Sequence, residues 1–299
     1  MEKNRLIIQK ENIPPEKKRY VSILGDSFST LAGWNPDGYC VYYQGDVCER
    51  LGVSEYADTW WGQVTDNIGG RLLTNNSWSG SRVTQLPRHR SLFPSGCSDE
   101  RILSLSSGGK KPDIILVMLG SNDLGYGVEL FPPLCSQNGG ITVRSAECGD
   151  ERYFSVAYDI MLKKLRANYP DAFIGCCTLF ACYYSFNPKM HFPDKESCSR
   201  YAEYNSVIRK TAAENGCSVI DIDSYCVSVS SGICSHPDHY GMQTIAKIVT
   251  RELLGEEADF LDCCGSHAYF KIMSESHRDM YVCGRCCKKT AVPFDREKS

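Results

Sequence analysis

Four small or polar residues that follow hydrophobic stretches of this sequence could together catalyse acyl transfer. They are Ser27, Gly80, Asn122 and His236, which follow the first, second, third and fifth stretches. Acyl transfer needs a nucleophile, a base within hydrogen-bond reach, and donors aimed at the developing oxyanion. A serine hydroxyl, an imidazole, a backbone N–H and a side-chain amide supply these groups. Taken singly, each of these residue types is more common in turns and helix caps, so the hypothesis depends on their occurring together.

A second group of residues, near the C-terminus, has the spacing of a structural zinc site. Its members are Cys264, His267, Cys283 and Cys286. Residues 268–273 and 279–282 between them are predicted to form two short strands of a hairpin, which would bring the two pairs together. Tetrahedral Zn²⁺ needs four such ligands, and so short a segment needs a bound metal or a similar cross-link to stay folded. Cys263 and Cys287 could replace their neighbours as ligands, and reduced cysteines packed against the main domain are the alternative interpretation.

The elements that must position the first group alternate between strand and helix. Hydrophobic stretches predict strands at residues 20–24, 72–75, 113–119, 172–178 and 218–222. Apolar residues spaced by three and four predict helices at residues 59–68, 152–168, 199–215 and 240–254. This alternation is typical of a mostly parallel sheet covered on both faces, with its active site beyond the carboxyl ends of the strands.

The chain divides into one large domain and a short C-terminal segment. We expect an N-terminal extension at residues 1–19, a catalytic domain at 20–255, a Cys- and His-rich segment at 259–290 and a flexible tail at 291–299. Two long stretches, 32–58 and 124–150, interrupt the alternation of strands and helices in the large domain. Long loops at strand ends are usually functional lids or binding walls.

Four sequence blocks in the large domain resemble the SGNH, or GDSL, hydrolase family. They are Gly25-Asp26-Ser27, Gly80 in an Asn-x-Ser-x-Ser-Gly segment, Gly120-Ser121-Asn122-Asp123, and His236-Pro237 followed by Gly241. No Gly-x-Ser-x-Gly is present, so the nucleophile elbow of the α/β-hydrolases is not the source of the pattern. The resemblance implies an α/β fold, a flavodoxin-like three-layer sandwich with a five-stranded parallel sheet. It also implies that Ser27 is the nucleophile, that His236 is the base, and that Gly80, Asn122 and the Ser27 N–H bind the oxyanion.

One position departs from the family pattern. The family usually has an Asp three residues before the histidine, where this chain has Ile233. Losing the carboxylate that orients the imidazole can cost roughly 10⁴ in rate. The replacement could be the carbonyl of Ile233 or Cys234, or the carboxylate of Asp221 or Asp223. We expect a Ser–His dyad completed by a carbonyl, and a weakened or inactive family member is the alternative.

Neighbours of the proposed catalytic residues have alternative interpretations. Asp26 and Asp123 could form a carboxylate pair, but we expect them to hydrogen-bond the loop backbone and support the site. Asp238 is expected to point away from the imidazole. His239 lies three residues after His236 and would replace it as the base if the alignment of the motif were shifted.

Aromatic residues are concentrated in the predicted loops near Ser27. We expect Trp34, Tyr42 and Trp78 to line a substrate cleft suited to a sugar ring or a short acyl chain. Trp60 and Trp61 begin a predicted helix and are expected to be core residues.

Composition and charge argue against several classes of protein. The 33 Lys and Arg residues nearly balance 36 Asp and Glu residues, which argues against broad electrostatic binding of nucleic acid. The longest apolar stretches are much shorter than the ~20 residues that span a bilayer, so no membrane partner is expected. The N-terminus has only three consecutive apolar residues, at positions 6–8, and lacks the pattern of a signal peptide. We therefore expect a cytoplasmic protein whose 17 cysteines are mostly reduced.

These observations lead to two hypotheses of different kinds. The first is a serine esterase that cleaves small O-acyl esters, for example of an acetylated carbohydrate, through an acyl-enzyme on Ser27 and without a catalytic cofactor. Transfer of the acyl group to an acceptor other than water would use the same residues. The second is a non-catalytic binding protein built on an SGNH scaffold, with the zinc-ribbon-like segment as a docking module. Ile233 supports the second hypothesis, whereas the four catalytic-type residues argue against it.

Overall fold

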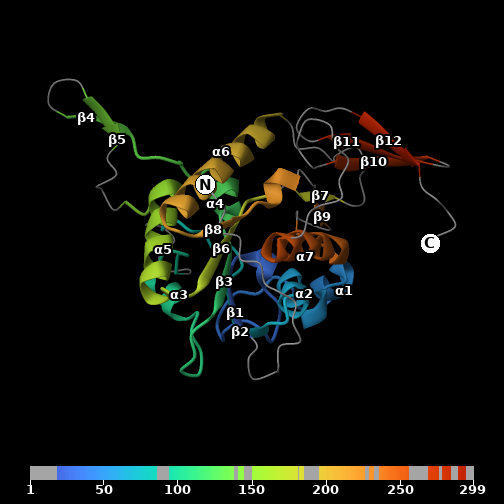
Figure 1. Cartoon of the computed structure of the whole chain (residues 1–299), viewed down its shortest axis with the longest axis horizontal. Helices are drawn as coiled ribbons and strands as arrows, with labels where there is room; N and C mark the ends of the chain where they lie inside the picture. The colour runs from blue at the N-terminus through green and yellow to red at the C-terminus, as the bar shows by residue number, and fades with distance from the viewer. Residues whose placement is uncertain are drawn as a thin grey trace.

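A five-stranded parallel sheet forms the centre of the computed structural model (Figure 1). The residues that the structure describes are 19–85, 94–137, 141–144, 150–180, 182–184, 195–225, 229–231, 236–255, 269–275, 278–283 and 289–293. The sheet contains β1 (Tyr20–Gly25), β2 (Arg71–Ser77), β3 (Ile114–Met118), β6 (Phe173–Cys177) and β8 (Ser218–Ile220). Their order is β2-β1-β3-β6-β8, and all neighbours are parallel. This flavodoxin-like order confirms the predicted fold class and the five predicted strands.

Strand β3 shows how the sequence builds a sheet that is covered on both faces. Ile114, Leu116 and Met118 belong to one hydrophobic cluster, and Ile115 and Val117 to the other. All five are nearly inaccessible to solvent. Successive side chains of a strand point to opposite faces, so a strand between two helical layers must be hydrophobic throughout.

Two layers of helices cover the sheet. On one face lie α2 (Trp60–Asn67) and α7 (His239–Leu254), and on the other lie α3 (Asp99–Leu103), α5 (Phe154–Asn168) and α6 (Lys195–Glu214). Figure 1 shows α5 on one side of the strands and α2 and α7 on the other. The four predicted helices correspond to α2, α5, α6 and α7, with ends that differ by a few residues. Among the described helices, none has the length and apolarity needed to cross a bilayer.

Several short elements of the large domain were not predicted. The helical ones are α3, given above, and η2 (Ser27–Ser29), α1 (Asp46–Leu51), η3 (Tyr56–Asp58), α4 (Ser121–Gly125) and η7 (Ile222–Tyr225). The extended ones are an antiparallel pair, β4 (Leu134–Gln137) and β5 (Ile141–Arg144), and a parallel pair, β7 (Cys182–Tyr184) and β9 (Val229–Ser231). Each element is shorter than the window over which hydrophobic periodicity can be recognised. The β4–β5 hairpin lies in the stretch 124–150, which was expected to be a loop.

The C-terminal segment forms a separate antiparallel sheet of three strands. The strands are β10 (Tyr269–Glu275), β11 (Arg278–Cys283) and β12 (Lys289–Pro293), in that order. The first two correspond to the predicted hairpin. The third was not predicted, and it places residues 291–293, the start of the expected flexible tail, in a strand.

Candidate active site

The turn after β1 carries Ser27 and leaves no room for a side chain at Gly25. A Cβ atom at Gly25 would lie 2.6 Å from Ser29 Oγ and 2.8 Å from Ser77 Oγ. Asp26 then caps the short helix η2, because its Oδ1 accepts the Phe28 N–H at 3.0 Å. Gly25 and Asp26 thus each have a physical reason for their position beside Ser27, and Asp26 hydrogen-bonds the loop backbone as expected.

Ser29 fastens the same turn to the neighbouring layers. Its Oγ accepts the indole N–H of Trp60 at 3.1 Å, and its carbonyl accepts that of Trp61 at 2.9 Å. The side-chain amide of Asn75, at the end of β2, donates to the same carbonyl at 2.7 Å. Both tryptophans are fully buried, as expected. Their polar atoms hold the turn while their rings fill the core.

The structure brings Ser27 and His236 into hydrogen-bond contact. Ser27 Oγ lies 2.8 Å from His236 Nε2, although the two residues are 209 positions apart. Ser27 is only 5% exposed. The carboxylate of Asp238, two residues after His236, acts as a helix cap: it accepts the Gly241 N–H at 2.9 Å at the start of α7. A hydroxyl and an imidazole at this distance can act as nucleophile and general base.

His239 lies in other surroundings. Its Nδ1 is 3.7 Å from an Asp58 carboxylate oxygen, and its Nε2 is 2.9 Å from the side-chain nitrogen of Gln243. In the described part of the chain, the ring makes no contact with Ser27. The geometry therefore favours His236 over the alternative base.

Gly80 and Asn122 lie on the loops that follow β2 and β3. Gly80 has φ +80°, a conformation that favours glycine. Asn122 donates one amide hydrogen to the Ser81 carbonyl at 2.9 Å, and its second amide hydrogen has no acceptor among the described residues. In the described part of the chain, neither the Ser27 N–H nor the Gly80 N–H has a protein acceptor. Backbone and amide donors of this kind can bind an oxyanion.

Asp123 ties the Asn122 loop to the loop after β2. Its two carboxylate oxygens accept the backbone N–H groups of Val83 and Thr84 at 2.9 and 3.1 Å, and the Thr84 hydroxyl at 2.7 Å. Burial raises the pKa of Asp123. This confirms the expected supporting role of Asp123.

One carboxylate oxygen of Asp26 makes no hydrogen bond within the described part of the chain. The side chain is buried, and Oδ2 has no partner among the described residues. Burial raises the pKa of Asp26 to about 7, and the nearby charge of Asp123 contributes to the increase. Its hydrogen bond from Phe28 and the charge of Arg101 act in the opposite direction. Asp26 therefore titrates near neutral pH, directly beside Ser27.

Arg101 joins the ends of β1 and β2 beneath the site. Its guanidinium is fully buried and donates to the carbonyls of Gly25 and Asn76, the Asn76 side-chain oxygen and the Ser81 hydroxyl. Burial lowers its pKa to about 10, so it remains protonated at neutral pH. Arg101 could not be recognised from the sequence, because its helix, α3, is too short to show a periodic pattern.

The three aromatic residues predicted to bind substrate lie in different places. The Tyr42 ring stacks on the His236 imidazole, with centroids 3.5 Å apart. The Trp78 ring packs on Tyr39 at 4.2 Å, and the Trp78 N–H donates to the carbonyl of Gly25. The ring contacts of Trp34 are instead with Tyr56 and Trp61, at 4.9 and 5.9 Å, on the α2 side. Tyr42 and Trp78 thus border the Ser27 turn and His236, whereas Trp34 packs beside α2.

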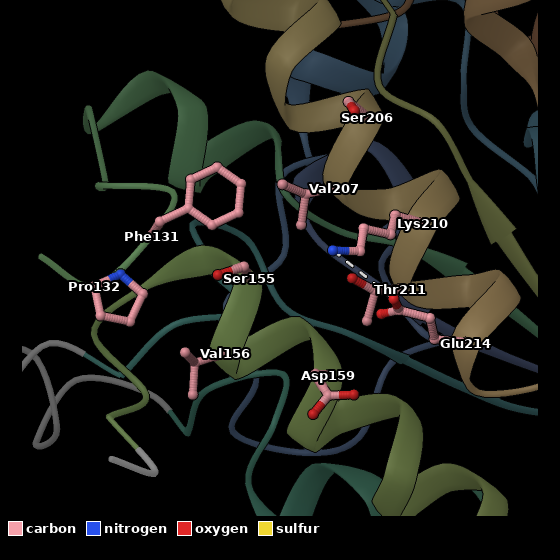
Figure 2. Close-up of a pocket in the computed structure, with 10 residues that line it drawn as sticks. All are labelled: Phe131, Pro132, Ser155, Val156, Asp159, Ser206, Val207, Lys210, Thr211 and Glu214. Carbon is pink, nitrogen blue, oxygen red and sulfur yellow. Dashed lines mark ion pairs between the residues drawn. The ribbon is translucent and has the colours of Figure 1, made fainter. Parts of the chain in front are cut away.

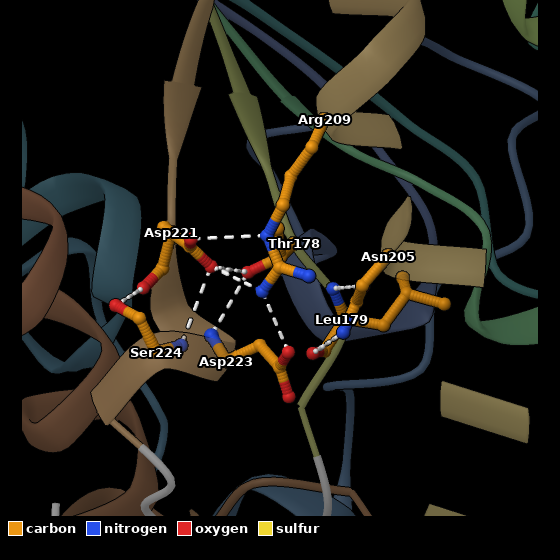
Figure 3. Close-up of polar contacts among 7 residues, drawn as sticks. All are labelled: Thr178, Leu179, Asn205, Arg209, Asp221, Asp223 and Ser224. Atoms are coloured by element: carbon orange, nitrogen blue, oxygen red, sulfur yellow. Dashed lines mark hydrogen bonds and ion pairs between the residues drawn. The ribbon is translucent and has the colours of Figure 1, made fainter. Parts of the chain in front are cut away.

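The two carboxylates considered as partners of His236 are held by Arg209 (Figure 3). Arg209 donates to Asp221 at 2.7 and 3.0 Å and to Asp223 at 2.6 Å. Asp221 also accepts the Thr178 hydroxyl at 3.3 Å. Neither carboxylate bonds to His236 in the described part of the chain. The other two candidates, the carbonyls of residues 233 and 234, lie outside the described residues.

The predicted metal ligands cannot be placed as a cluster. Cys264, His267 and Cys286 lie outside the described residues, and only the backbone of Cys283, at the end of β11, is described. Among the described residues, no group of three or more His, Cys, Asp or Glu side chains could hold a metal ion.

A pocket of about 440 Å³ lies between α5 and α6, with none of the predicted site residues in its lining. Figure 2 shows Phe131 and Pro132 at one end and the Lys210–Glu214 ion pair at the other. Its lining combines apolar side chains with the polar side chains of Ser155, Asp159, Ser206, Lys210, Thr211 and Glu214. The hydrogen-bonded pair of Ser27 and His236 lies outside this lining.

Comparisons with known proteins show the family of this chain. The sequence model of the family described as GDSL-like Lipase/Acylhydrolase matches residues 19–253. A solved structure of a Bacteroides uniformis protein described as a GDSL-like lipase has 26% identity and a TM-score of 0.57. The match covers 80% of this chain and 97% of that chain. No curated protein matches the chain.

Two more distant solved structures show the fold alone. A protein of Bacteroides ovatus, also described as a GDSL-like lipase, has 22% identity and a TM-score of 0.54, over 78% of this chain and 96% of that chain. A protein of Agrobacterium tumefaciens described as an arylesterase has 14% identity and a TM-score of 0.50, over the same shares of the two chains.

Proposed function

Because this chain belongs to the GDSL-like lipase/acylhydrolase family and is a hydrolase of that type, we propose that it is a serine esterase acting through an acyl-enzyme on Ser27. One observation carries the proposal, the 2.8 Å distance between Ser27 Oγ and His236 Nε2. The fold supports it, since Ser27 directly follows β1, at the edge where parallel sheets bind ligands, and His236 contacts it there. No cofactor is needed for this chemistry.

In the proposed reaction, Ser27 Oγ attacks the ester carbonyl while its proton passes to His236 Nε2. The oxyanion is bound by the N–H groups of Ser27 and Gly80 and by the free amide hydrogen of Asn122. The imidazolium then returns the proton to the leaving alcohol as the C–O bond breaks. Water deprotonated by His236 attacks the acyl-enzyme, which releases the acid and restores the Ser27 hydroxyl.

We infer that a backbone carbonyl orients the His236 imidazole in this reaction. Asp221 and Asp223 both accept hydrogen bonds from Arg209, and in the described part of the chain neither carboxylate contacts the ring. The carbonyls of Ile233 and Cys234 precede His236 by only three and two positions and can accept an imidazole N–H. In this proposal, one of these carbonyls takes the role that the Asp has in the family.

We propose a small O-acyl ester, such as an acetylated carbohydrate, as the substrate. The support comes from the ring pair of Tyr39 and Trp78, two residues before Gly80, because a sugar ring packs well on aromatic faces. The oxyanion donors would then sit next to a flat hydrophobic wall. Acyl transfer to an alcohol instead of water would use the same residues, and product analysis in the presence of a sugar acceptor distinguishes the two.

We also propose a structural zinc ion in the C-terminal segment, bound by Cys264, His267, Cys283 and Cys286. The pairing of β10 with β11 supports it, because Cys283 lies opposite Tyr269, two positions after His267. Thiolate and imidazole donors suit tetrahedral Zn²⁺ in a closed site. Purified protein should contain about one zinc per chain. Near-zero zinc with an unchanged unfolding transition would remove the proposal.

The esterase proposal is tested with p-nitrophenyl esters from acetate to octanoate. We expect Ser27→Ala and His236→Gln each to lower kcat/KM by about 10³-fold or more. His239→Gln is the matched control, because its ring contacts Asp58 and Gln243, and it should stay within about threefold of the unaltered chain. A burst of p-nitrophenol equal to the enzyme concentration would report the acyl-enzyme. Activity that survives Ser27→Ala would overturn the proposal.

A further inference from the structure

The imidazole of His236 is enclosed by two aromatic rings. The Tyr42 ring lies parallel to it, with an interplanar angle of 11° and centroids 3.5 Å apart. The Phe28 ring meets it edge-on, at 88° and 5.2 Å. We propose that Tyr42 is a positioning residue, which holds the plane of the His236 ring toward Ser27 and stabilises the imidazolium formed during acyl transfer. This inference deepens the proposed function and rests on it.

The backbone of Tyr42 is tied to the nucleophile turn. The Tyr42 N–H donates to Thr30 Oγ1 at 2.9 Å, and the Thr30 hydroxyl donates to the Ser27 carbonyl at 3.0 Å. The ring of Tyr42 is thus fixed relative to Ser27 through two consecutive hydrogen bonds. A shift of the Tyr42 loop would therefore change the relation between the stacked imidazole and the nucleophile.

The next residue, Tyr43, is tied to the histidine loop. Its phenol is fully buried and donates to the Pro237 carbonyl at 2.7 Å. Burial raises the pKa of Tyr43 well above its ordinary value, so the phenol remains a donor throughout the useful pH range. Tyr42 and Tyr43 together connect the segment of Ser27 to the segment of His236.

The stacked Tyr42 ring restricts a motion of the imidazole that hydrogen bonds to its nitrogens leave open. An imidazole held by Ser27 at Nε2 and by the proposed carbonyl at its other nitrogen can still tilt about the line that joins these two bonds. Turning the ring out of its plane would drive it into the face of Tyr42, at 3.5 Å between centroids. An aromatic face also attracts a cation, so the protonated imidazole gains more from Tyr42 than the neutral one. Other charged groups near this loop are Asp26, next to Ser27, and Asp238, which caps α7.

The stacking also alters the expected role of Tyr42. One face of its ring is covered by His236, so only the other face could contact a substrate. A residue that only lined the cleft would act mainly on KM when changed. A positioning residue would act mainly on kcat and on the pH dependence of the base.

The test compares Tyr42→Phe and Tyr42→Leu, with Tyr56→Leu as the matched control. Tyr56 is another partly buried tyrosine, and its ring packs on Trp61, away from His236. We expect Tyr42→Leu to lower kcat about 10-fold with KM changed less than about 2-fold. The acid limb of kcat/KM should move to lower pH by about half a unit, because the imidazolium loses a stabilising contact. Tyr42→Phe should keep kcat and the acid limb close to those of the unaltered chain. Tyr56→Leu should change neither quantity.

A second measurement does not depend on turnover. In the Ser27→Ala background, the His236 ring signal is identified by its loss in His236→Gln and followed by NMR against pH. Tyr42→Leu should move this signal downfield and lower the pH at its midpoint, because a stacked ring shields the imidazole protons. An unchanged signal and midpoint would overturn the inference, as would an effect on KM alone. Absence of esterase activity in the unaltered chain would contradict the proposed function while leaving this measurement informative.

Discussion

Replacing Asp26 by asparagine should remove a pH dependence from the stability of the fold. The folded chain raises the pKa of this buried carboxyl from 3.8 to about 7. Between pH 4 and 7 the folded state therefore holds a proton that the unfolded state has lost. Stability falls with rising pH wherever the folded state binds more protons. The native chain is thus expected to lose stability across this window, and the loss should level off above pH 7.

The size of the change in unfolding free energy follows from the shift in the pKa of Asp26. A difference of about three pKa units at 1.36 kcal/mol each corresponds to about 4 kcal/mol at most. An asparagine side chain at this position cannot ionise, and its amide oxygen can still accept the Phe28 N–H. The free energy of unfolding of Asp26→Asn, relative to the native chain, should therefore rise by up to about 4 kcal/mol from pH 4 to pH 7. The difference in unfolding free energy between Asp26→Asn and the native chain should be constant from pH 7.5 to pH 9.

The assay is urea unfolding of both proteins at half-unit steps of pH, followed by tryptophan fluorescence. Trp60 and Trp61 are buried beside the Ser27 turn and report its exposure. Asp37→Asn is the matched control, since Asp37 is an exposed residue of the next loop. A difference between Asp26→Asn and the native chain that does not vary with pH would refute the reasoning. A native chain that gains stability relative to the variant as pH rises would show that Arg101 keeps the carboxylate ionised.

Three further changes test other parts of the site. Asn122→Ala removes a proposed oxyanion donor and should lower kcat on p-nitrophenyl acetate by about 10²–10³-fold, with little change in KM. An unchanged kcat would contradict this role. Asp221→Asn weakens a half-exposed ion pair with Arg209 and should cost about 1 kcal/mol of unfolding free energy while kcat stays within about threefold; a loss of several hundredfold in kcat would instead identify the orienting carboxylate. Arg101→Met leaves buried acceptors unpaired and should destabilise the fold by about 3 kcal/mol or more in urea unfolding, whereas a loss below about 1 kcal/mol would contradict its structural role.

The regular elements of this fold could be predicted from the sequence because their patterns are local. Strand β3 is recognisable as a short, continuously hydrophobic stretch, and α7 by its apolar spacing between Asp238 and Gly255. Short elements such as α1, α4 and the β7–β9 pair lack such a pattern. Their stability comes from contacts with distant parts of the chain, so they could not be predicted from their own residues.

The residues able to do chemistry were also recognisable in the sequence, because serine, histidine, glycine and asparagine at strand ends form a specific combination. Their mutual geometry depended on tertiary structure. The Ser27–His236 contact spans 209 positions, and the stacking of Tyr42 on His236 joins two loops with no common sequence pattern. The buried guanidinium of Arg101 had no local signal at all. Side-chain type and spacing along the chain are set by local sequence, whereas hydrogen-bond distances between remote residues arise only when the packed sheet and helices bring their loops to the same edge.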